Sequence, residues 1–288
     1  MTREGDEHYA AYANGTGRGA IKVTQSGSIT TQGCNDQGIR ARSHGHGAVT
    51  VTQTGDVSTQ GATAHGIYAR SFGAGAVTVT QTGDITTQGN AAHGINAYSD
   101  GAVTVTQTGD IAANGLNASG IVGASTGGNI AITVGPGGTV QGGTGTGAGV
   151  RFGYGGGFLP GVDNTLTNRG TVWALSGTAV LGDTGNETID NYGTIIGKVT
   201  LGGGGDVFDN MQGGTFEARE TSDFGTGTDL FRNRSGGRVH TATSAGTAET
   251  TAFEGLETFQ NQGLISTVDG GTGDVFTISN TVGGTDLN

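Results

Sequence analysis

Acidic side chains recur at one place in a repeated string, and this is the first pattern that could do chemistry. Asp56, Asp84 and Asp110 each end a Thr-Gly-Asp triplet in three near copies of GAVTVTQTGD. General acid–base catalysis needs acids that converge on one groove with a second acid or a basic group. A catalytic set is unique to one place, whereas these acids recur with the string. We therefore interpret them as turn residues and predict no catalytic residues.

Four further acids fall in predicted turns, and the sequence indicates no convergent partner for them: Asp206, Asp209, Asp229 and Asp274. Three Gly-Asp strings resemble the calcium-binding nonapeptide G-G-x-G-x-D-x-U-x: GGGGDVF (Gly202–Phe208), GTGTDLF (Gly225–Phe231) and GGTGDVF (Gly270–Phe276). Only the middle copy has the right spacing before its Asp, and it lacks the first Gly. Adjacent turns share the ion in such sites, so consecutive correct copies are needed. We predict no metal site and no cofactor, and we keep calcium as an alternative.

Histidine and cysteine offer little more chemistry. His44 and His46 form an H-x-H pair without a further ligand nearby in sequence, which favours a solvated loop over a metal site. His65 and His93 occupy equivalent positions of the repeat, where other copies have Gln or Ser, so we interpret this position as a polar turn slot. Cys34 is the only cysteine, and we expect a free surface thiol.

Arginine and tyrosine mark a candidate binding face. Aligned copies of the third strand of the repeat place outward residues in two columns: Tyr12, Arg40, Tyr68, Asn96, Val122 and Arg151, and Asn14, Arg42, Arg70 and Tyr98. Tyr and Arg are favoured anchors of binding surfaces, and Arg can engage sialylated or carboxylated glycans bidentately. The predicted binding residues are Tyr12, Arg40, Arg42, Tyr68, Arg70, Asn96, Tyr98 and Arg151. The alternative is ordinary solvated decoration of a strand.

The elements that position these residues follow from the repeat. The string begins at Gly19, Gly47, Gly75 and Gly101, so its starts step by 28, 28 and 26 residues. A period in this range is typical of a solenoid. Residues 47–75 contain three short strings in which apolar and polar residues alternate or aliphatic side chains point inward: AVTVTQ, VSTQG and IYARS. Gly-containing turns separate these strings. The sequence therefore predicts three short strands for each coil.

Stacking the coils aligns the aliphatic residues into four inward columns, and neighbouring coils would pair in parallel. The columns are Ile21, Val49, Val77, Val103 and Ile130; Val23, Val51, Val79, Val105 and Ile132; Ile29, Val57, Ile85, Ile111 and Val140; and Ile39, Ile67, Ile95, Ile121 and Val150. We predict an all-β fold, a parallel β-helix that is a single-stranded β-solenoid with three strands per coil.

Composition narrows the classes of partner. The 288 residues include 61 Gly, the hydrophobic fraction is 33% and the net charge is −11. Gly-rich polar chains are often disordered, but a fixed register argues for order here. The negative charge makes nucleic acid or an anionic membrane an unsuitable main partner. The sequence has no apolar run long enough for a transmembrane helix, and its first residues are not a signal peptide.

The second half follows a looser rule. Asn168, Asn191, Asn210, Asn233 and Asn261 recur after an apolar residue at steps of 23, 19, 23 and 28. We predict that their side-chain amides stack in a ladder, or that they mark turns. The expected organisation is regular coils over 1–141, a Gly-rich bulge or connection over 142–161, and irregular coils with the Asn ladder over 162–288.

The strings NYGTIIGKVTLGGGGDVFDN and FEGLETFQNQGLI and the degenerate VTQTGD coils carry a family resemblance. The whole chain resembles the passenger region of Gram-negative autotransporters (type V secretion). The resemblance implies a right-handed helix displayed at the cell surface or secreted. The sequence contains neither a signal peptide nor a translocator barrel, and its first coil is incomplete. We therefore expect a segment of a longer protein that meets the membrane only through a barrel outside this sequence.

Three classes of function remain. The first is a non-enzymatic adhesin or stalk whose partners are proteins or glycans of the host or of neighbouring cells. The second is a polysaccharide-active lyase or hydrolase, since such enzymes share the β-helix fold. The third is an ice or calcium binder, because outward Thr pairs such as Thr50 and Thr52 would form a flat array. Exposed terminal coils would also favour end-to-end self-association.

Overall fold

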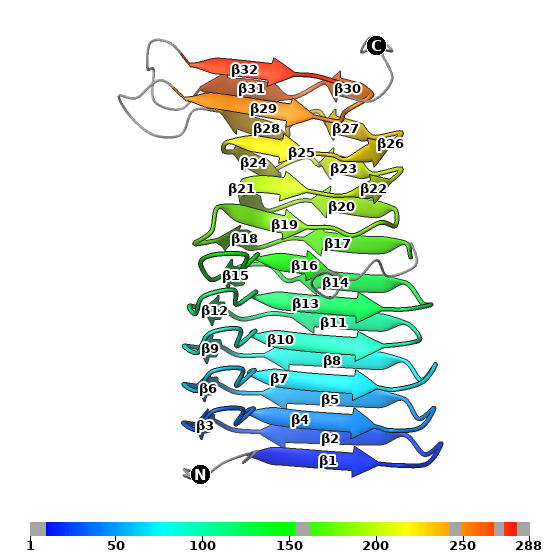
Figure 1. The fold of residues 1–288 in the computed structure, drawn as a ribbon. Helices are drawn as coiled ribbons and strands as arrows, with labels where there is room; N and C mark the ends of the chain where they lie inside the picture. The colour runs from blue at the N-terminus through cyan, green and yellow to red at the C-terminus, as the bar shows by residue number, and fades with distance from the viewer. Residues whose placement is uncertain (1–9, 154–161, 242–248, 268–273, 281–288) are drawn as a thin grey trace.

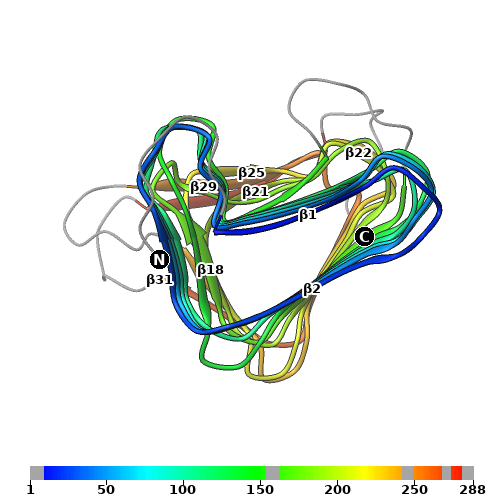
Figure 2. The ribbon, with the colours of Figure 1, turned by 90° about the horizontal axis from the view of Figure 1, so that it is seen from below.

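The protein forms a right-handed parallel β-helix in a computed structural model that describes residues 10–153, 162–241, 249–267 and 274–280. Viewed from its N-terminal end, the chain winds clockwise as it recedes from the viewer (Figure 2). The coils stack into a column with three faces (Figure 1). No helix occurs in the described ranges, and therefore none there could cross a membrane. The predicted fold class is confirmed.

The first face is a sheet of 10 parallel strands, one from each successive coil. Each strand alternates buried and more exposed residues, as a half-buried strand should. The strands are β2 (Ile21–Ser26), β5 (Val49–Thr54), β8 (Val77–Thr82), β11 (Val103–Gln107), β14 (Ile130–Val134), β17 (Asn164–Asn168), β20 (Glu187–Asn191), β23 (Val207–Asn210), β27 (Leu230–Asn233) and β30 (Thr258–Asn261).

The second face consists of short strands that also pair in parallel from coil to coil. They are β3 (Ile29–Thr31), β6 (Val57–Thr59), β9 (Ile85–Thr87), β12 (Ile111–Ala113), β15 (Thr139–Gly142), β18 (Thr171–Ala174), β24 (Thr215–Ala218), β28 (Arg238–Thr241) and β31 (Leu264–Thr267). The long strand β21 (Thr194–Thr200) pairs with β18 at one end and with a third-face strand at the other. It thereby joins these two faces into one 20-stranded sheet.

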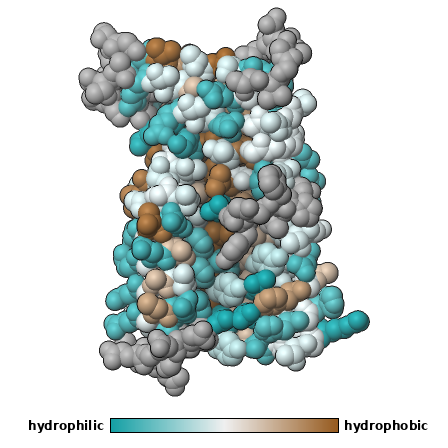
Figure 3. Space-filling view, viewed as in Figure 1, coloured by the Kyte–Doolittle hydropathy of each residue, from teal (hydrophilic) through white to brown (hydrophobic). Residues whose placement is uncertain are grey.

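The third face carries the predicted binding residues. Its strands are β1 (Ala11–Gly15), β4 (Ile39–Ser43), β7 (Ile67–Ser71), β10 (Ile95–Ser99), β13 (Ile121–Ser125), β16 (Val150–Phe152), β19 (Thr178–Leu181), β25 (Thr221–Asp223), β29 (Thr250–Glu254) and β32 (Val275–Ile278). A small extra pair, β22 (Gly203–Gly204) with β26 (Thr226–Gly227), lies in the turns that lead to the first face. This third face looks toward the viewer in the space-filling view, where its surface is mostly polar with scattered apolar residues (Figure 3).

The aliphatic columns form the core in the predicted register. Val51 pairs with Val79, Val79 pairs with Val105, and all three side chains are fully buried. The other three columns pair in the same way through Val49, Val57 and Ile67 and their neighbours. Each coil buries its inward side chains against the next coil, which is how a chain with so few hydrophobic residues builds one continuous core.

The solenoid continues across the Gly-rich segment. Strand β14 pairs with β17, β15 with β18 and β16 with β19, so all three faces extend from one side of the segment to the other. Residues 154–161 of the predicted bulge lie outside the described residues. The core stays aliphatic up to Leu201 and then becomes rich in aromatic residues, with Phe208, Phe216, Phe231 and Phe253 in contact at fully buried positions.

The second half contains the predicted ladder of amides. The Nδ2 of each Asn donates to the Oδ1 of the next, at 2.8 Å from Asn168 to Asn191, 2.9 Å from Asn191 to Asn210 and 2.8 Å from Asn210 to Asn233. The same Nδ2 atoms donate to carbonyls beyond the corner, as Asn210 does to Arg238 O at 2.9 Å. The ladder therefore supplies partners for polar groups that the corner buries, which is the condition for burying them.

Replacing Asn210 by alanine is expected to lower the free energy of unfolding by on the order of 2–4 kcal/mol. The change leaves the Arg238 carbonyl and the Asn233 Oδ1 without this donor inside the column. Urea unfolding measures the loss. Asn129→Ala is the matched control, because Asn129 is exposed, and it should change stability by less than about 0.5 kcal/mol. Equal losses in the two variants would show that the ladder contributes no stability.

Candidate functional site

A turn of unusual shape connects the second and third faces in four successive coils of the first half. Its tip is a residue with positive φ that is not glycine: Asn35 (59°), Thr63 (54°), Ala91 (51°) and Asn117 (58°). A Thr in this region is strained, since β-branched side chains rarely adopt it. The turn ends at a buried glycine such as Gly66, whose added Cβ would lie 2.6 Å from the Gly94 carbonyl oxygen. Because glycine recurs at this position, with no Cβ to clash, neighbouring turns can pack this closely.

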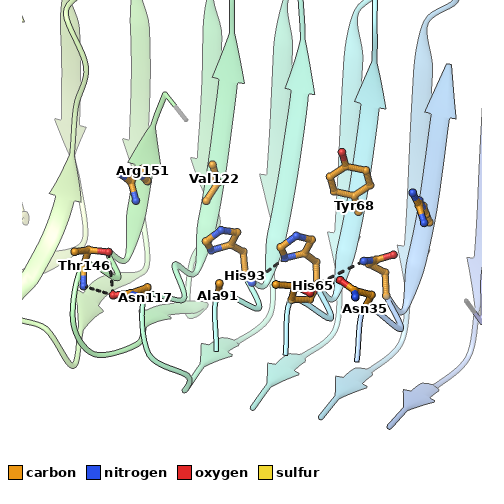
Figure 4. A pocket seen from close by; sticks show the side chains of 12 residues that line it. Asn35, His65, Tyr68, Ala91, His93, Asn117, Val122, Thr146 and Arg151 are labelled. Carbon is orange, nitrogen blue, oxygen red and sulfur yellow. Dashed lines mark hydrogen bonds between the residues drawn. The ribbon is translucent and has the colours of Figure 1, made fainter. Parts of the chain in front are cut away.

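These turns and the outer side of the third face enclose a groove of about 450 Å³ that runs along the solenoid (Figure 4). The groove spans strands β4 to β16, so five successive coils contribute to it. Its described lining residues include Arg40 and Arg151 but no Asp or Glu. The lining is therefore positively charged in a chain whose net charge is −11. Among the described residues, no three His, Cys, Asp or Glu side chains form a group suited to hold a metal ion.

Two stacked histidines lie in the wall of the groove. The rings of His65 and His93 lie 5.0 Å apart between centroids and nearly parallel. His65 Nδ1 accepts the backbone N–H of His93 at 3.0 Å, and His93 Nδ1 accepts that of Ser119 at 2.9 Å. An Nδ1 that accepts a hydrogen bond leaves the proton on Nε2. Both rings are therefore Nε2–H tautomers, and each one can donate from its far edge.

Burial keeps both rings neutral. It lowers the pKa of His65 to about 3, with the neighbouring His93 adding to the fall. It also lowers the pKa of His93 to about 4, with the nearby charge of Arg151 acting in the same direction. The predicted polar turn slot thus gains a defined role, which is to hold the stacked turns together through ring nitrogens that accept backbone N–H groups. The two imidazoles carry no charge at neutral pH.

Asn96 keeps its predicted outward register, but the prediction that it forms part of an exposed binding face is wrong. Asn96 is fully buried and Val122 is 2% exposed, because the turns cover this part of the third face. Asn96 Nδ2 lies 3.3 Å from His65 Nε2, and Asn96 Oδ1 is buried without a partner. Since His65 Nε2 carries a hydrogen, the position suits the amide oxygen, and we assign the Asn96 amide turned by half a rotation. Asn96 therefore lies beneath the groove and holds the ring of His65, which lines it.

The other predicted residues of the first column stay in their predicted register. Tyr12 pairs with Arg40, Arg40 with Tyr68, and Val122 with Arg151. Arg40, Tyr68 and Arg151 line the groove, and the Arg40 guanidinium lies 5.9 Å from the Tyr68 ring centroid. Tyr12 is 54% exposed on β1, outside the described lining of the groove. Three of the eight predicted residues thus meet in one cavity.

The second column forms an arginine–aromatic cluster, which we define as Arg42, His44, Arg70, Phe72 and Tyr98. It touches the groove where Arg70 Nη1 donates to the Tyr68 hydroxyl at 3.5 Å. The Arg70 guanidinium lies 3.8 Å from the Phe72 ring centroid and 4.5 Å from that of Tyr98. Arg42 lies 5.0 Å from the Phe72 ring, on which His44 also stacks at 4.7 Å. Stacking on rings holds the guanidinium planes in place at little entropic cost. Sequence reasoning overlooked Phe72, whereas His44 lies exposed in a turn, as predicted.

The repeated acids are structural, as their recurrence predicts. Asp56 Oδ1 accepts the backbone N–H of Asp84 at 3.1 Å, and Asp84 Oδ1 accepts that of Asp110 at 2.8 Å. Each carboxylate caps the next turn while it stays exposed to solvent. Cys34 is an exposed free thiol, as predicted.

The expectation that Asp206, Asp209 and Asp229 lack convergent partners is wrong, and Asp209 lies on strand β23 rather than in a turn. Asp209 forms ion pairs with Arg232 and with Arg234, the latter at 3.0 Å. Burial raises the pKa of Asp209, but hydrogen bonds from the two arginines outweigh it and hold the pKa below its ordinary value. The fourth acid, Asp274, accepts the backbone N–H of Glu249 at 3.0 Å. Residues 270–273 of the third calcium-like string lie outside the described residues.

Asp206 and Asp229 stack with Glu187 in a buried column, which we call the carboxyl column. Glu187 N donates to Asp206 Oδ1 at 2.7 Å, and Asp206 N donates to Asp229 Oδ1 at 2.7 Å. The second carboxyl oxygen of each residue is buried without a hydrogen-bond partner. Burial raises the pKa of all three groups, to about 7 for Asp229. All three side chains are fully buried, so a substrate would have no access to them.

Comparison with known proteins adds no relative: no protein-family model, curated protein or solved structure matches the chain.

Proposed function

We propose that the chain is a non-enzymatic segment of a surface-displayed passenger of the autotransporter type. It acts as an adhesin or stalk and presents a binding face to proteins or glycans of the host or of neighbouring cells. In this proposal the cell is a Gram-negative bacterium and the segment is displayed at its surface or secreted.

One observation carries the proposal. On the third face, the inward residues stay aliphatic or small from coil to coil, while the outward residues change and include Arg40, Arg42, Tyr68, Arg70 and Tyr98. A stalk that only extended would need no such concentration of arginine and aromatic side chains on one face. These residue types dominate the energetics of binding surfaces, and here stacking fixes their positions in advance.

The arginine–aromatic cluster provides the test. We expect wild-type protein to bind glycans or matrix proteins on an array, and the Arg42→Ala/Arg70→Ala variant to bind at least about 10-fold more weakly. Arg219→Ala/Arg238→Ala removes the same charge from exposed positions elsewhere and serves as the matched control. Circular dichroism should show that all three proteins fold alike.

Two outcomes would contradict the proposal. If the cluster variant and the control bind every array ligand as wild type does, the cluster is no binding surface. Release of unsaturated or reducing products from a panel of polyuronates would instead support the polysaccharide-active enzyme, because a non-enzymatic segment releases none.

A further inference from the structure

We propose that the groove over strands β4 to β16 binds a linear carbohydrate chain that carries carboxylates, extended along the solenoid axis. This inference rests on the proposed binding function and adds the site and the class of ligand. Arg40 and Arg151 lie at opposite ends of the groove, on the same outward column and four strand spacings apart. Four spacings correspond to roughly 19 Å, which is the length of several sugar residues.

Charge selects an anionic ligand. The lining holds two guanidinium groups, and none of its described residues is acidic. The whole chain has a net charge of −11, which disfavours the approach of an anion in general, so the positively charged lining of the groove is a local exception. Guanidinium groups also match carboxylates bidentately, which gives geometric selectivity as well as attraction.

The uncharged polar residues of the lining suit the hydroxyl groups of a sugar chain. The Nε2–H edge of His93 is a donor that stays neutral, since burial lowers its pKa to about 4. Asn35, Thr63 and Asn117 recur at the tips of successive turns and offer amide and hydroxyl groups. Thr63 Oγ1 is held by Asn35 Oδ1 of the preceding turn, and Thr146 N by Asn117 Oδ1 at 2.9 Å. The polar groups are thus positioned before any ligand arrives.

The same lining disfavours an acidic peptide. A peptide that binds an extended surface needs either a free strand edge or pockets for apolar anchors. The third-face strands under the groove pair on both sides with their neighbours, so they offer no edge. Val122 is the largest aliphatic residue in the lining and is 2% exposed. A carbohydrate with carboxylates therefore fits the groove better than a peptide does.

Calorimetric titration of the whole chain tests the inference with four probes: oligogalacturonate, hyaluronan oligosaccharides, neutral maltoheptaose and polyglutamate. We expect one of the two acidic carbohydrates to bind and the neutral sugar and the polypeptide not to bind. Arg40→Gln and Arg151→Gln should each weaken binding by about 10-fold or more. Arg219→Gln, which removes one positive charge from an exposed site, should leave it unchanged.

The pH dependence gives a second readout. Because the pKa values of His65 and His93 are about 3 and about 4, both rings stay neutral from pH 5 to pH 8. Affinity should therefore be constant over this range, whereas a site built on protonated histidines would weaken as the pH rises.

Each contrary result has its own meaning. Binding of an acidic carbohydrate that is lost in Arg42→Ala/Arg70→Ala but kept in Arg40→Gln and Arg151→Gln would overturn the groove and retain the proposed binding face. If polyglutamate bound more tightly than the acidic carbohydrates, or if maltoheptaose bound as tightly as they do, the proposed class of ligand would be overturned. No binding of either acidic carbohydrate would overturn the inference, while binding of another array ligand would still support the proposed function.

Discussion

Phe231→Ala is expected to lower the free energy of unfolding by about 3–5 kcal/mol, the largest effect of any single substitution considered for this protein. Phe231 is fully buried on β27 and lies at the centre of the aromatic core. Its ring centroid lies 5.0 Å from that of Phe208, 5.1 Å from that of Phe253 and 5.4 Å from that of Phe259. The loss has two parts: the hydrophobic free energy that the buried ring contributed, and the cost of a cavity that the rigid stacked strands cannot close.

Leu175→Ala is the control for this prediction. Leu175 is 47% exposed, so its truncation should change stability by less than about 0.5 kcal/mol. Urea unfolding followed by circular dichroism measures both variants. A loss below about 1 kcal/mol for Phe231→Ala would mean that the second half is loosely packed, contrary to the stacked rings described above.

Raising the pH from 5 to 8 is expected to destabilise the second half of the solenoid by on the order of 2–4 kcal/mol, through the carboxyl column. Glu187, Asp206 and Asp229 are buried, and burial raises the pKa of each, to about 7 for Asp229. Asp183 and Glu257 face the column and are also acidic. The folded state therefore favours the neutral acids.

The direction of the effect follows from proton release. Well below pH 3.8 the acids are protonated in both the folded and the unfolded chain, and the raised pKa values cost nothing. As the pH rises above the ordinary value of 3.8 for Asp, the unfolded chain releases protons that the folded chain retains. Stability falls until the pH passes the folded pKa, which is about 7 for Asp229 and is also raised for Glu187. Melting temperatures measured between pH 4 and pH 9 should decrease accordingly.

Isosteric amides identify the groups responsible. Glu187→Gln and Asp206→Asn retain the oxygens that accept Asn164 Nδ2 and the Glu187 backbone N–H, but they cannot ionise. Each should raise the melting temperature at pH 8 and flatten its pH dependence. Asp56→Asn, at an exposed turn, is the control and should change neither. An unchanged pH profile in Glu187→Gln would remove the column as its cause.

Buried carboxyl groups can be neutralised by protons or by a bound cation, and a calcium titration distinguishes the two. If the column is neutral because it is protonated, millimolar calcium or a chelator should leave the melting temperature at pH 8 unchanged. A rise with calcium that Asp206→Asn abolishes would instead show that a cation takes the place of the protons, and would revive the calcium alternative for the Gly-Asp turns.

The fold could be predicted from sequence because the signal repeats. Val51, Val79 and Val105 alternate with polar residues in near-identical strings, and a register error in such a stack would turn every aliphatic side chain to solvent. The amide ladder could be predicted for the same reason, since Asn168, Asn191 and their successors keep a constant position after an apolar residue.

The groove could not be predicted in this way, because it depends on how far a turn projects. Alternation correctly placed Asn96 on the outer side of its strand, but it contains nothing about a turn from the same coil that folds over that side. The carboxyl column was missed for a related reason. Spacings of 19 and 23 residues between Glu187, Asp206 and Asp229 differ, and only the three-dimensional stack shows that unequal coils bring them into line.

The turn that walls the groove has a consequence for how this gene can change. Each unit carries its own strands, its own turn and its own groove position, and the stretches 47–61 and 75–89 are nearly identical over 15 residues. Unequal recombination between them would add or delete one whole unit and leave every remaining side chain in phase. The length of the groove is thus heritable in steps of one coil, while the hydrophobic interior stays constant.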